Sequence, residues 1–348
     1  MRIIGPFLVL AIAGTGLLFG LNRTPVDSKT RPADAGAFSG ATMGTTYSVK
    51  VAGLSTAANR DRLAAEIQGQ LDRINRLMST YDPDSELSRF NASDSGQWFP
   101  VSPETARVVA EAIRVGDLSG GALDVTVGPI VDLWSFGPEA RPQGVLPTGE
   151  EITAAMSTVG YTRLEVRHDP PALRKPSPAC RVDLSSLAKG FAVDQVVERL
   201  EELGIDRYMV EVGGEIRTAG LNSSGNPWQI AVELPTTEGR GIQRVVPLDG
   251  RAMATSGDYR NYFEQDGVRF CHIIDPRAGR PVSHRLASVS VLADNCMRAD
   301  ALATALFVLG PEEGLQLAAE HSIPALFLVR TDRGFAEYPI SHFPVSPP

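Results

Sequence analysis

The chain is poor in cysteine and has no cluster of basic residues. Its 348 residues include three cysteines, Cys180, Cys271 and Cys296, which are too few for a disulfide scaffold. One pair could form in an oxidising compartment, and a fully reduced set agrees with the sequence equally well. The formal net charge is −8, and no run of Lys and Arg counters it. The composition therefore argues against a nucleic-acid partner.

Several common motifs are also missing. The glycine patterns of Rossmann and P-loop proteins do not occur. The His-Glu-x-x-His of zinc proteases and the Gly-x-Ser-x-Gly of α/β-hydrolases are absent as well. No repeat of solenoid length appears. The candidates for chemistry are therefore short polar islands within otherwise apolar stretches.

A long apolar run is present at the N-terminus. Residues 3–21 carry no charge and follow Arg2, and a polar stretch comes after them. This order is typical of an export signal, and the run has about the length that a helix needs to span a bilayer. We therefore predict a signal peptide or signal anchor over residues 1–21, with cleavage left open.

The remaining chain predicts one α+β domain. Residues 22–39 have the Pro, Asp, Ser, Lys and Gly content of a linker, so the folded domain is expected over residues 40–348. Strand and helix patterns do not alternate regularly there, which favours a mixed or antiparallel sheet with packed helices over a doubly wound fold. The expected strands are 45–51, 207–216, 228–234, 245–248, 288–292, 325–330 and 334–338, and the expected helices include 63–78, 187–203, 299–309 and one starting after Ser102.

The most informative segment connects a predicted strand to a predicted helix. Residues 181–184 have an extended pattern, and residues 187–203 carry the helical period. Ser185 or Ser186 is expected to cap that helix, and Lys189 adds a positive charge to its first turn. A helix start of this kind attracts a phosphate or a carboxylate. The segment alone does not distinguish between these two anions.

A second island lies in the predicted helix at 299–309. Asp300 and Thr304 are spaced i, i+4 and project from one face. One carboxylate and one hydroxyl make a plausible partial site for Mg²⁺, which keeps waters and takes oxygens from substrate phosphates. The alternative is an early-helix acid stabilised by the dipole, with a threonine bonded back to a carbonyl.

His272 is the candidate general base, because an imidazole titrates near neutral pH. The alternative is a surface histidine beside a hairpin turn. A zinc site of Cys271, His272, His284 and Cys296 is disfavoured, because adjacent strand residues point to opposite faces. Tyr81 either stacks on an aromatic ligand or covers the core from a polar loop.

Taken together, these islands resemble the FAD:protein FMN transferases, the ApbE flavin-transferase family. The resemblance runs from residue 40 to about residue 338. The matching segments are 41–45 (ATMGT), 79–91 (STYDPDSELSRFN), 121–126 (GALDVT), 183–190 (DLSSLAKG), 212–214 (VGG), 255–259 (TSGDY), 272–276 (HIIDP) and 299–304 (ADALAT). All occur in the order typical of the family.

The resemblance implies an ApbE-like fold, related to the T-fold, with FAD as substrate in an extended groove and Mg²⁺ at the diphosphate. Mg²⁺ would be held by Asp300 and Thr304 and by carbonyl oxygens of Ser186 and Ala303. Residues implied to contact the flavin nucleotide are Met43, Tyr81, Ala122, Leu123, Asp124, Asp183, Lys189 and Ile274.

The implied reaction passes the FMN half of FAD to a threonine hydroxyl of an acceptor protein and releases AMP, with His272 and Asp300 as the catalytic candidates. The implied acceptors are flavin-carrying subunits of membrane redox complexes of the Nqr or Rnf type. An exported N-terminus agrees with this, and we expect the periplasmic face of the inner membrane. A Mg²⁺-dependent FAD pyrophosphatase and a non-catalytic periplasmic flavin-binding protein are the alternatives.

Overall fold

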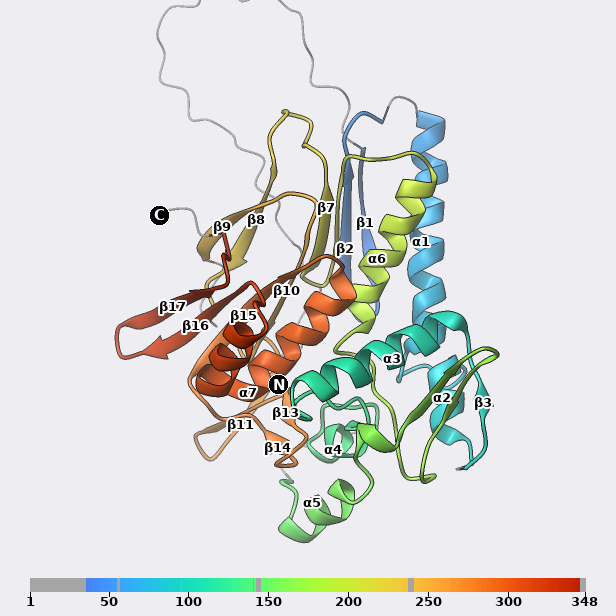
Figure 1. Ribbon diagram of the computed structural model, residues 1–348, viewed down its shortest axis with the longest axis vertical. Helices are drawn as coiled ribbons and strands as arrows, with labels where there is room; N and C mark the ends of the chain where they lie inside the picture. The colour runs from blue at the N-terminus through green and yellow to red at the C-terminus, as the bar shows by residue number, and fades with distance from the viewer. Residues whose placement is uncertain are drawn as a thin grey trace, which may run out of the picture.

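An eight-stranded antiparallel sheet organises the fold (Figure 1). The structure, a computed structural model, describes residues 36–344 except for 55–56, 95, 140, 142–144 and 237–240. The predicted export segment at 1–21 and most of the predicted linker lie outside the described residues. Within the described ranges, no helix has the length and apolar character needed to cross a membrane.

The sheet follows the order β1-β2-β6-β7-β10-β15-β16-β17. Its strands are β1 (Gly36–Thr42), β2 (Thr45–Val51), β6 (Tyr208–Val212), β7 (Glu215–Ala219), β10 (Ala252–Gly257), β15 (Leu286–Ala293), β16 (Ala325–Thr331) and β17 (Gly334–Ile340). The smaller sheets contain β3 (Phe99–Pro100), β4 (Glu165–His168), β5 (Pro171–Arg174), β8 (Trp228–Glu233), β9 (Ile242–Leu248), β11 (Tyr262–Gln265), β12 (Val268–Cys271), β13 (Ile274–Asp275) and β14 (Arg280–Pro281).

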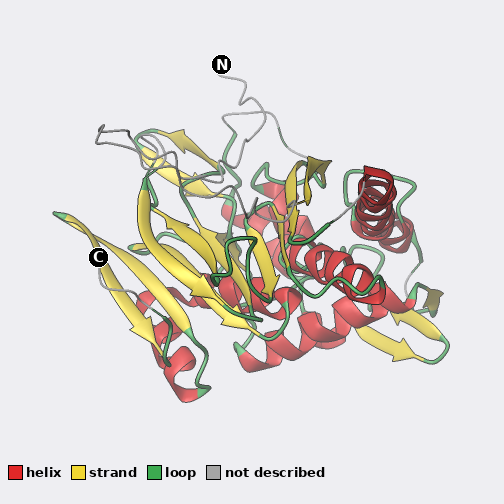
Figure 2. Ribbon diagram, turned by 90° about the horizontal axis from the view of Figure 1, so that it is seen from above, coloured by secondary structure: helices red, strands yellow, loops and turns green. Residues whose placement is uncertain are grey.

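Long helices lie against one side of the large sheet (Figure 2). The helices of the described ranges are α1 (Ala57–Met78), α2 (Glu86–Ala92), α3 (Pro103–Leu118), α4 (Gly128–Leu133), α5 (Gly149–Met156), α6 (Ala188–Glu202), α7 (Cys296–Glu320) and the short 3-10 turn Tyr161–Arg163. In α1 the predicted apolar face is buried at Leu63, Ile67, Leu71 and Ile74, because these positions recur with the helical period.

The centre of the sheet is covered on both faces. Every residue of β15 is buried. Val289 and Val291 belong to the main core beneath the helices, whereas Leu292 belongs to a second cluster with β8 and β9. β15 also buries two polar residues, Ser288 and Ser290, and Ser290 Oγ lies 2.8 Å from Thr255 Oγ1 of β10. The predicted α+β class with a large antiparallel sheet is confirmed.

Three local predictions were wrong. The strand expected at 207–216 is two strands, because Gly213 and Gly214 adopt φ values of 61° and 107° and turn the chain back as a hairpin. The expected Ser185 or Ser186 cap is absent: the N-cap of α6 is Leu187, without a side-chain bond. Residues 36–39, predicted to be linker, belong to β1, because pairing with β2 makes a strand of this segment of mostly small residues.

The helix α7 extends beyond the predicted range and is kinked. Gly310 has a φ of 78°, and Pro311 follows it. Proline is tolerated in the first turn of a helix but not in its interior, so a second helical segment begins at the kink. The first segment carries Asp300 and Thr304 toward the sheet.

Candidate active site

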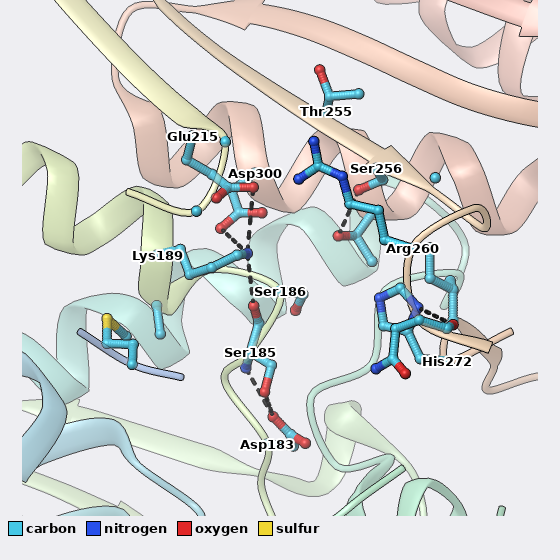
Figure 3. A pocket seen from close by; sticks show the side chains of 18 of the residues that line it. Asp183, Ser185, Ser186, Lys189, Glu215, Thr255, Ser256, Arg260, His272 and Asp300 are labelled. Atoms are coloured by element: carbon cyan, nitrogen blue, oxygen red, sulfur yellow. Dashed lines mark hydrogen bonds and ion pairs between the residues drawn. The ribbon is translucent and has the colours of Figure 1, made fainter. Parts of the chain in front are cut away.

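A cavity of about 930 Å³ lies where the ends of β7 and β10 meet the first turns of α6 and α7 (Figure 3). It collects segments that are far apart in the sequence. The predicted site residues that line it are Met43, Tyr81, Ala122, Leu123, Asp124, Asp183, Ser186, Lys189, His272, Ile274, Asp300 and Thr304. The buried Ala303 lies on α7 and is not part of this lining, so a metal contact through its carbonyl stays a prediction.

The centre of the site is an ammonium shared by two carboxylates. Lys189 Nζ lies 3.6 Å from Asp300 Oδ2 and 3.4 Å from Glu215 Oε1. Asp300 and Glu215 are 3 % and 4 % exposed. Burial raises the pKa of Asp300 and that of Glu215, whereas the Lys189 ammonium lowers both. Burial alone would lower the pKa of Lys189, but Asp300 and Glu215 raise it, so the lysine remains a cation in the site.

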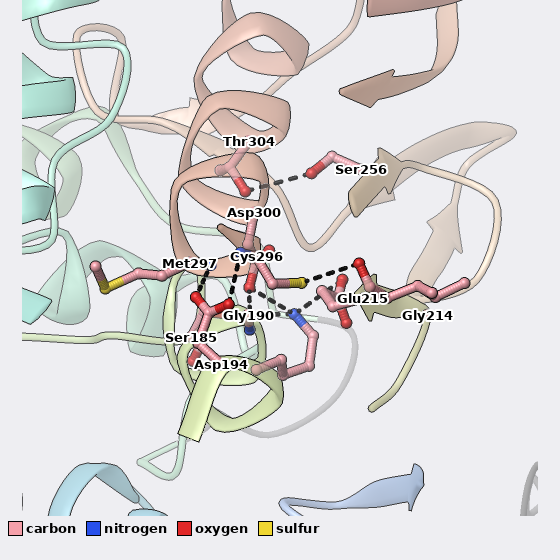
Figure 4. Close-up of polar contacts among 12 residues, drawn as sticks. Ser185, Gly190, Asp194, Gly214, Glu215, Ser256, Cys296, Met297, Asp300 and Thr304 are labelled. Atoms are coloured by element: carbon pink, nitrogen blue, oxygen red, sulfur yellow. Dashed lines mark hydrogen bonds and ion pairs between the residues drawn. The ribbon is translucent and has the colours of Figure 1, made fainter. Parts of the chain in front are cut away.

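The close contact of α6 with α7 places this group (Figure 4). The Gly190 amide donates to Asp300 Oδ2 at 3.1 Å. A Cβ on Gly190 would lie 2.3 Å from the Cys296 carbonyl oxygen, so only glycine allows the helices to approach this closely. Asp194 of α6 accepts from the Cys296 and Met297 amides at 2.9 Å each and thereby caps α7.

The neighbouring segments add further oxygen atoms. Thr304 Oγ1 lies 3.3 Å from Ser256 Oγ. Asp183 Oδ1 accepts from the Ser185 amide at 2.8 Å and from the Ser185 hydroxyl. Ser185 therefore holds the loop before α6 through Asp183 instead of capping the helix.

His272 lines the same cavity (Figure 3). Its Nδ1 lies 3.1 Å from the Asn261 carbonyl oxygen, which can only accept a hydrogen bond. Nδ1 of the neutral ring therefore carries the proton, and Nε2 can accept another. Burial lowers the pKa of His272 from its usual value, which keeps the ring neutral and available as a base at neutral pH.

Two of the predicted flavin contacts differ in character. Tyr81 is 70 % exposed, and its hydroxyl donates to the Phe136 carbonyl at 3.2 Å, so its ring remains free to stack. Asp124 is buried, and its carboxylate accepts from the Thr126 amide at 2.7 Å and the Tyr161 amide at 3.0 Å. The Asp124 side chain therefore holds its own loop together.

The charged residues of the cavity that were not predicted as site residues include Glu211, Glu215 and Arg260. The glutamates flank the Gly213–Gly214 turn, where the small residues were noticed and the acids were not. Burial raises the pKa of Glu211 to about 7. The sequence signal that could have predicted these charged lining residues is the pair of glutamates on either side of the double glycine.

The set of oxygen donors fits a hard divalent cation. In the described ranges no group of three or more His, Cys, Asp and Glu side chains could hold a metal ion. The buried Glu215 Oε2 has no hydrogen-bond partner among the described residues. In their ionised forms, the Asp300 and Glu215 carboxylates together carry one more charge than the Lys189 ammonium between them.

The cysteines are all free and buried. Cys271 Sγ approaches the Ile273 carbonyl at 3.6 Å, and Cys296 Sγ approaches the Ile216 carbonyl at 3.6 Å. His284 Nε2 bonds to the Phe307 carbonyl at 2.7 Å. Each of these three side chains contacts a different backbone carbonyl.

Comparison with known proteins identifies the family. The model of the ApbE family matches residues 43–327. The chain belongs to the ApbE family. A Vibrio cholerae protein named FAD:protein FMN transferase is 51 % identical over 313 residues, covering 90 % of this chain and 93 % of the relative. A Haemophilus influenzae protein of the same name is 48 % identical, covering 88 % and 89 %.

Solved structures of the same family are similar to this fold. The flavin transferase ApbE from Vibrio cholerae has a TM-score of 0.83 at 50 % identity, covering 90 % of this chain and 99 % of that one. The apo flavinyl transferase ApbE of Pseudomonas stutzeri has a TM-score of 0.79 at 41 % identity, covering 88 % and 94 %. The predicted family and the predicted transferase class of the enzyme are confirmed.

Proposed function

We propose that this ApbE-family protein transfers the FMN moiety of FAD to a threonine hydroxyl of an acceptor protein and releases AMP. The observation that carries the proposal is one cavity that combines the Lys189–Asp300 pair with a neutral His272 whose Nε2 can take a proton. The relatives are named FAD:protein FMN transferases, which supports FAD as the donor and a protein as the acceptor.

In the proposed reaction, each bond that forms and breaks and the proton that moves can be assigned. The threonine oxygen forms a bond to the phosphorus of the FMN half, and the bond from that phosphorus to the AMP oxygen breaks. The hydroxyl proton goes to His272 Nε2, and AMP leaves with the electron pair. Lys189 offsets negative charge on the diphosphate, while Asp183 and the Ser185 amide keep the loop before α6 in place.

Magnesium dependence is part of the proposal. Asp300 and Thr304, with carbonyl oxygens of Ser186 and Ala303, would hold the ion. When bound, Mg²⁺ would neutralise charge on the diphosphate.

The cellular setting is also proposed. The apolar N-terminal run supports export and action at the periplasmic face of the inner membrane, whether the run is retained as an anchor or cleaved. The acceptor would then be a flavin-carrying subunit of the Nqr or Rnf type, and it would present its threonine in that compartment.

Intact-mass measurement tests the transfer. The protein is incubated with FAD, Mg²⁺ and an acceptor domain of this type, and a Thr→Ala acceptor serves as the matched control. We expect the threonine acceptor alone to gain the mass of FMN less water, and we expect chelation of the metal to abolish the gain. Free FMN without acceptor labelling would instead support the pyrophosphatase, and unchanged FAD would support a binding protein.

A further inference from the structure

Glu215 is a buried carboxylate to which the proposed reaction gives no role. It is 4 % exposed at the start of β7, and it lines the cavity. Its Oε2 is buried and has no hydrogen-bond partner among the described residues. An unsatisfied buried carboxylate oxygen costs stability, so its presence points to a use within the site.

The Gly213–Gly214 turn holds Glu215 against Lys189. A Cβ on Gly213 would lie 3.2 Å from Lys189 Cδ and 2.9 Å from Thr45 Cγ2. The turn therefore packs directly on the aliphatic stem of the lysine. Glu215 follows this turn immediately and meets the ammonium end, with Oε1 3.4 Å from Nζ.

The Lys189 ammonium lies within ion-pair distance of two carboxylates. Its Nζ lies 3.4 Å from Glu215 and 3.6 Å from Asp300. In a buried site a one-to-one ion pair is strong, because little water screens it. If Glu215 were neutral, Asp300 would be the remaining carboxylate at Lys189, and the ammonium would compete there with any cation.

We propose that Glu215 is a positioning residue that retains Lys189 and thereby keeps Asp300 available to a divalent cation. This inference rests on the proposed function, which assigns Lys189 and Asp300 to a metal–diphosphate site. It adds that the Glu215 carboxylate holds the Lys189 ammonium, so that the Asp300 carboxylate is free to bind the cation. Glu215 acts through Lys189 and touches neither substrate nor metal.

A double-mutant cycle separates this role from a general effect of charge. Mn²⁺ binding, read by electron paramagnetic resonance with the full protein, is measured for Glu215→Gln, Lys189→Met and the double variant, with and without FAD. We expect Glu215→Gln to weaken Mn²⁺ binding at least tenfold when Lys189 is present. In the Lys189→Met background the same change should alter binding less than threefold.

Other outcomes overturn the inference. An equal loss in both backgrounds would mean that Glu215 attracts or ligates the cation by itself. No loss in either background, or no Mn²⁺ binding by the unmodified protein with or without FAD, would also refute the role. FMN transfer is scored separately, so transfer can fail while the Mn²⁺ coupling persists, and the reverse can also occur.

Two further variants control for folding. Glu165→Gln removes a carboxylate that pairs with Arg174 at the surface, and it should leave Mn²⁺ binding and thermal unfolding unchanged. If Glu215→Gln does not fold, Glu215→Asp replaces it in both backgrounds. That variant keeps the charge but shortens the reach, so it should give a smaller loss that still depends on Lys189.

Discussion

The state of His272 is set by one backbone carbonyl. Because the Asn261 oxygen accepts from Nδ1, the proton-accepting nitrogen of the ring is Nε2. Burial keeps this ring neutral by lowering its pKa. The residue type alone suggests a base. The tautomer depends on Asn261, whose carbonyl oxygen accepts from Nδ1 and also from the His272 backbone amide at 3.0 Å.

His272→Ala should remove the fall in kcat that the unmodified protein shows at low pH. The pKa of His272 is lowered below 6.5, so we expect kcat in the unmodified protein to be maintained near neutrality and to fall only as the pH drops through that lowered value. The variant should lose about 10²–10⁴-fold in kcat and show no such limb, while FAD binding, read by flavin fluorescence, persists. Near-normal transfer by the variant would eliminate His272 as the base.

At the scale of elements, the site depends on how closely α6 approaches α7. The Gly190 amide reaches the Asp300 carboxylate, and Asp194 caps the first turn of α7 from the neighbouring helix. These contacts join the Lys189 turn of α6 to the Asp300 turn of α7. The two helices can approach closely enough for these contacts because Gly190 has no side chain.

Gly190→Ala should separate these two helices. The new Cβ would lie 2.3 Å from the Cys296 oxygen and 2.9 Å from Asp300 Cβ, so α6 must move. Overpacking of this kind costs about 1–3 kcal/mol, and we expect a lower melting temperature together with a loss of transfer activity, measured by calorimetry and by acceptor mass.

The matched control is Gly69→Ala in α1, where a Cβ meets nothing within 4 Å. There the helix should become more stable by about 0.5–1 kcal/mol, and activity should not change. If both variants behaved alike, close packing at Gly190 would not be the reason for its importance.

At the scale of the whole molecule, the two faces of the sheet have different tasks. The helices cover one face and bring the charged turns of α6 and α7 to the cavity. The hairpin β8–β9 covers other positions through a separate cluster that includes Leu248, Leu292, Leu326 and Leu328. Much of that cluster supports stability at a distance from Lys189 and Asp300.

Leu328→Ala should therefore separate stability from binding. Leu328 is fully buried and does not line the cavity. Such a truncation costs about 2–5 kcal/mol of unfolding free energy, which denaturant titration would measure. FAD affinity of the folded fraction should stay within about twofold of the unmodified protein, because the contacts at the cavity are unchanged. A large loss of affinity would show that the two regions are coupled.

Local sequence patterns predicted the elements that depend on neighbours in the chain. The face of α1 followed from residue spacing, and the start of α3 followed from Ser102 with Pro103, a cap that the structure confirms with a bond from the Thr105 amide. The start of α6 did not follow the same rule. There Ser185 bonds to Asp183, and the first turn is held by contacts with α7, which no local pattern reveals.

By itself, the sequence determined the α+β class, the family and a set of predicted site residues that, apart from Ala303, line the cavity, because these depend on ordered motifs and local periodicity. The tertiary structure decided which charges meet. Gly190 and Asp300 are separated by 110 residues yet share a hydrogen bond, and Glu215 joins Lys189 only because a double-glycine turn brings β7 onto α6. Electrostatic coupling depends on distance in space, so the shared ammonium at the centre of the site became visible only in the folded chain.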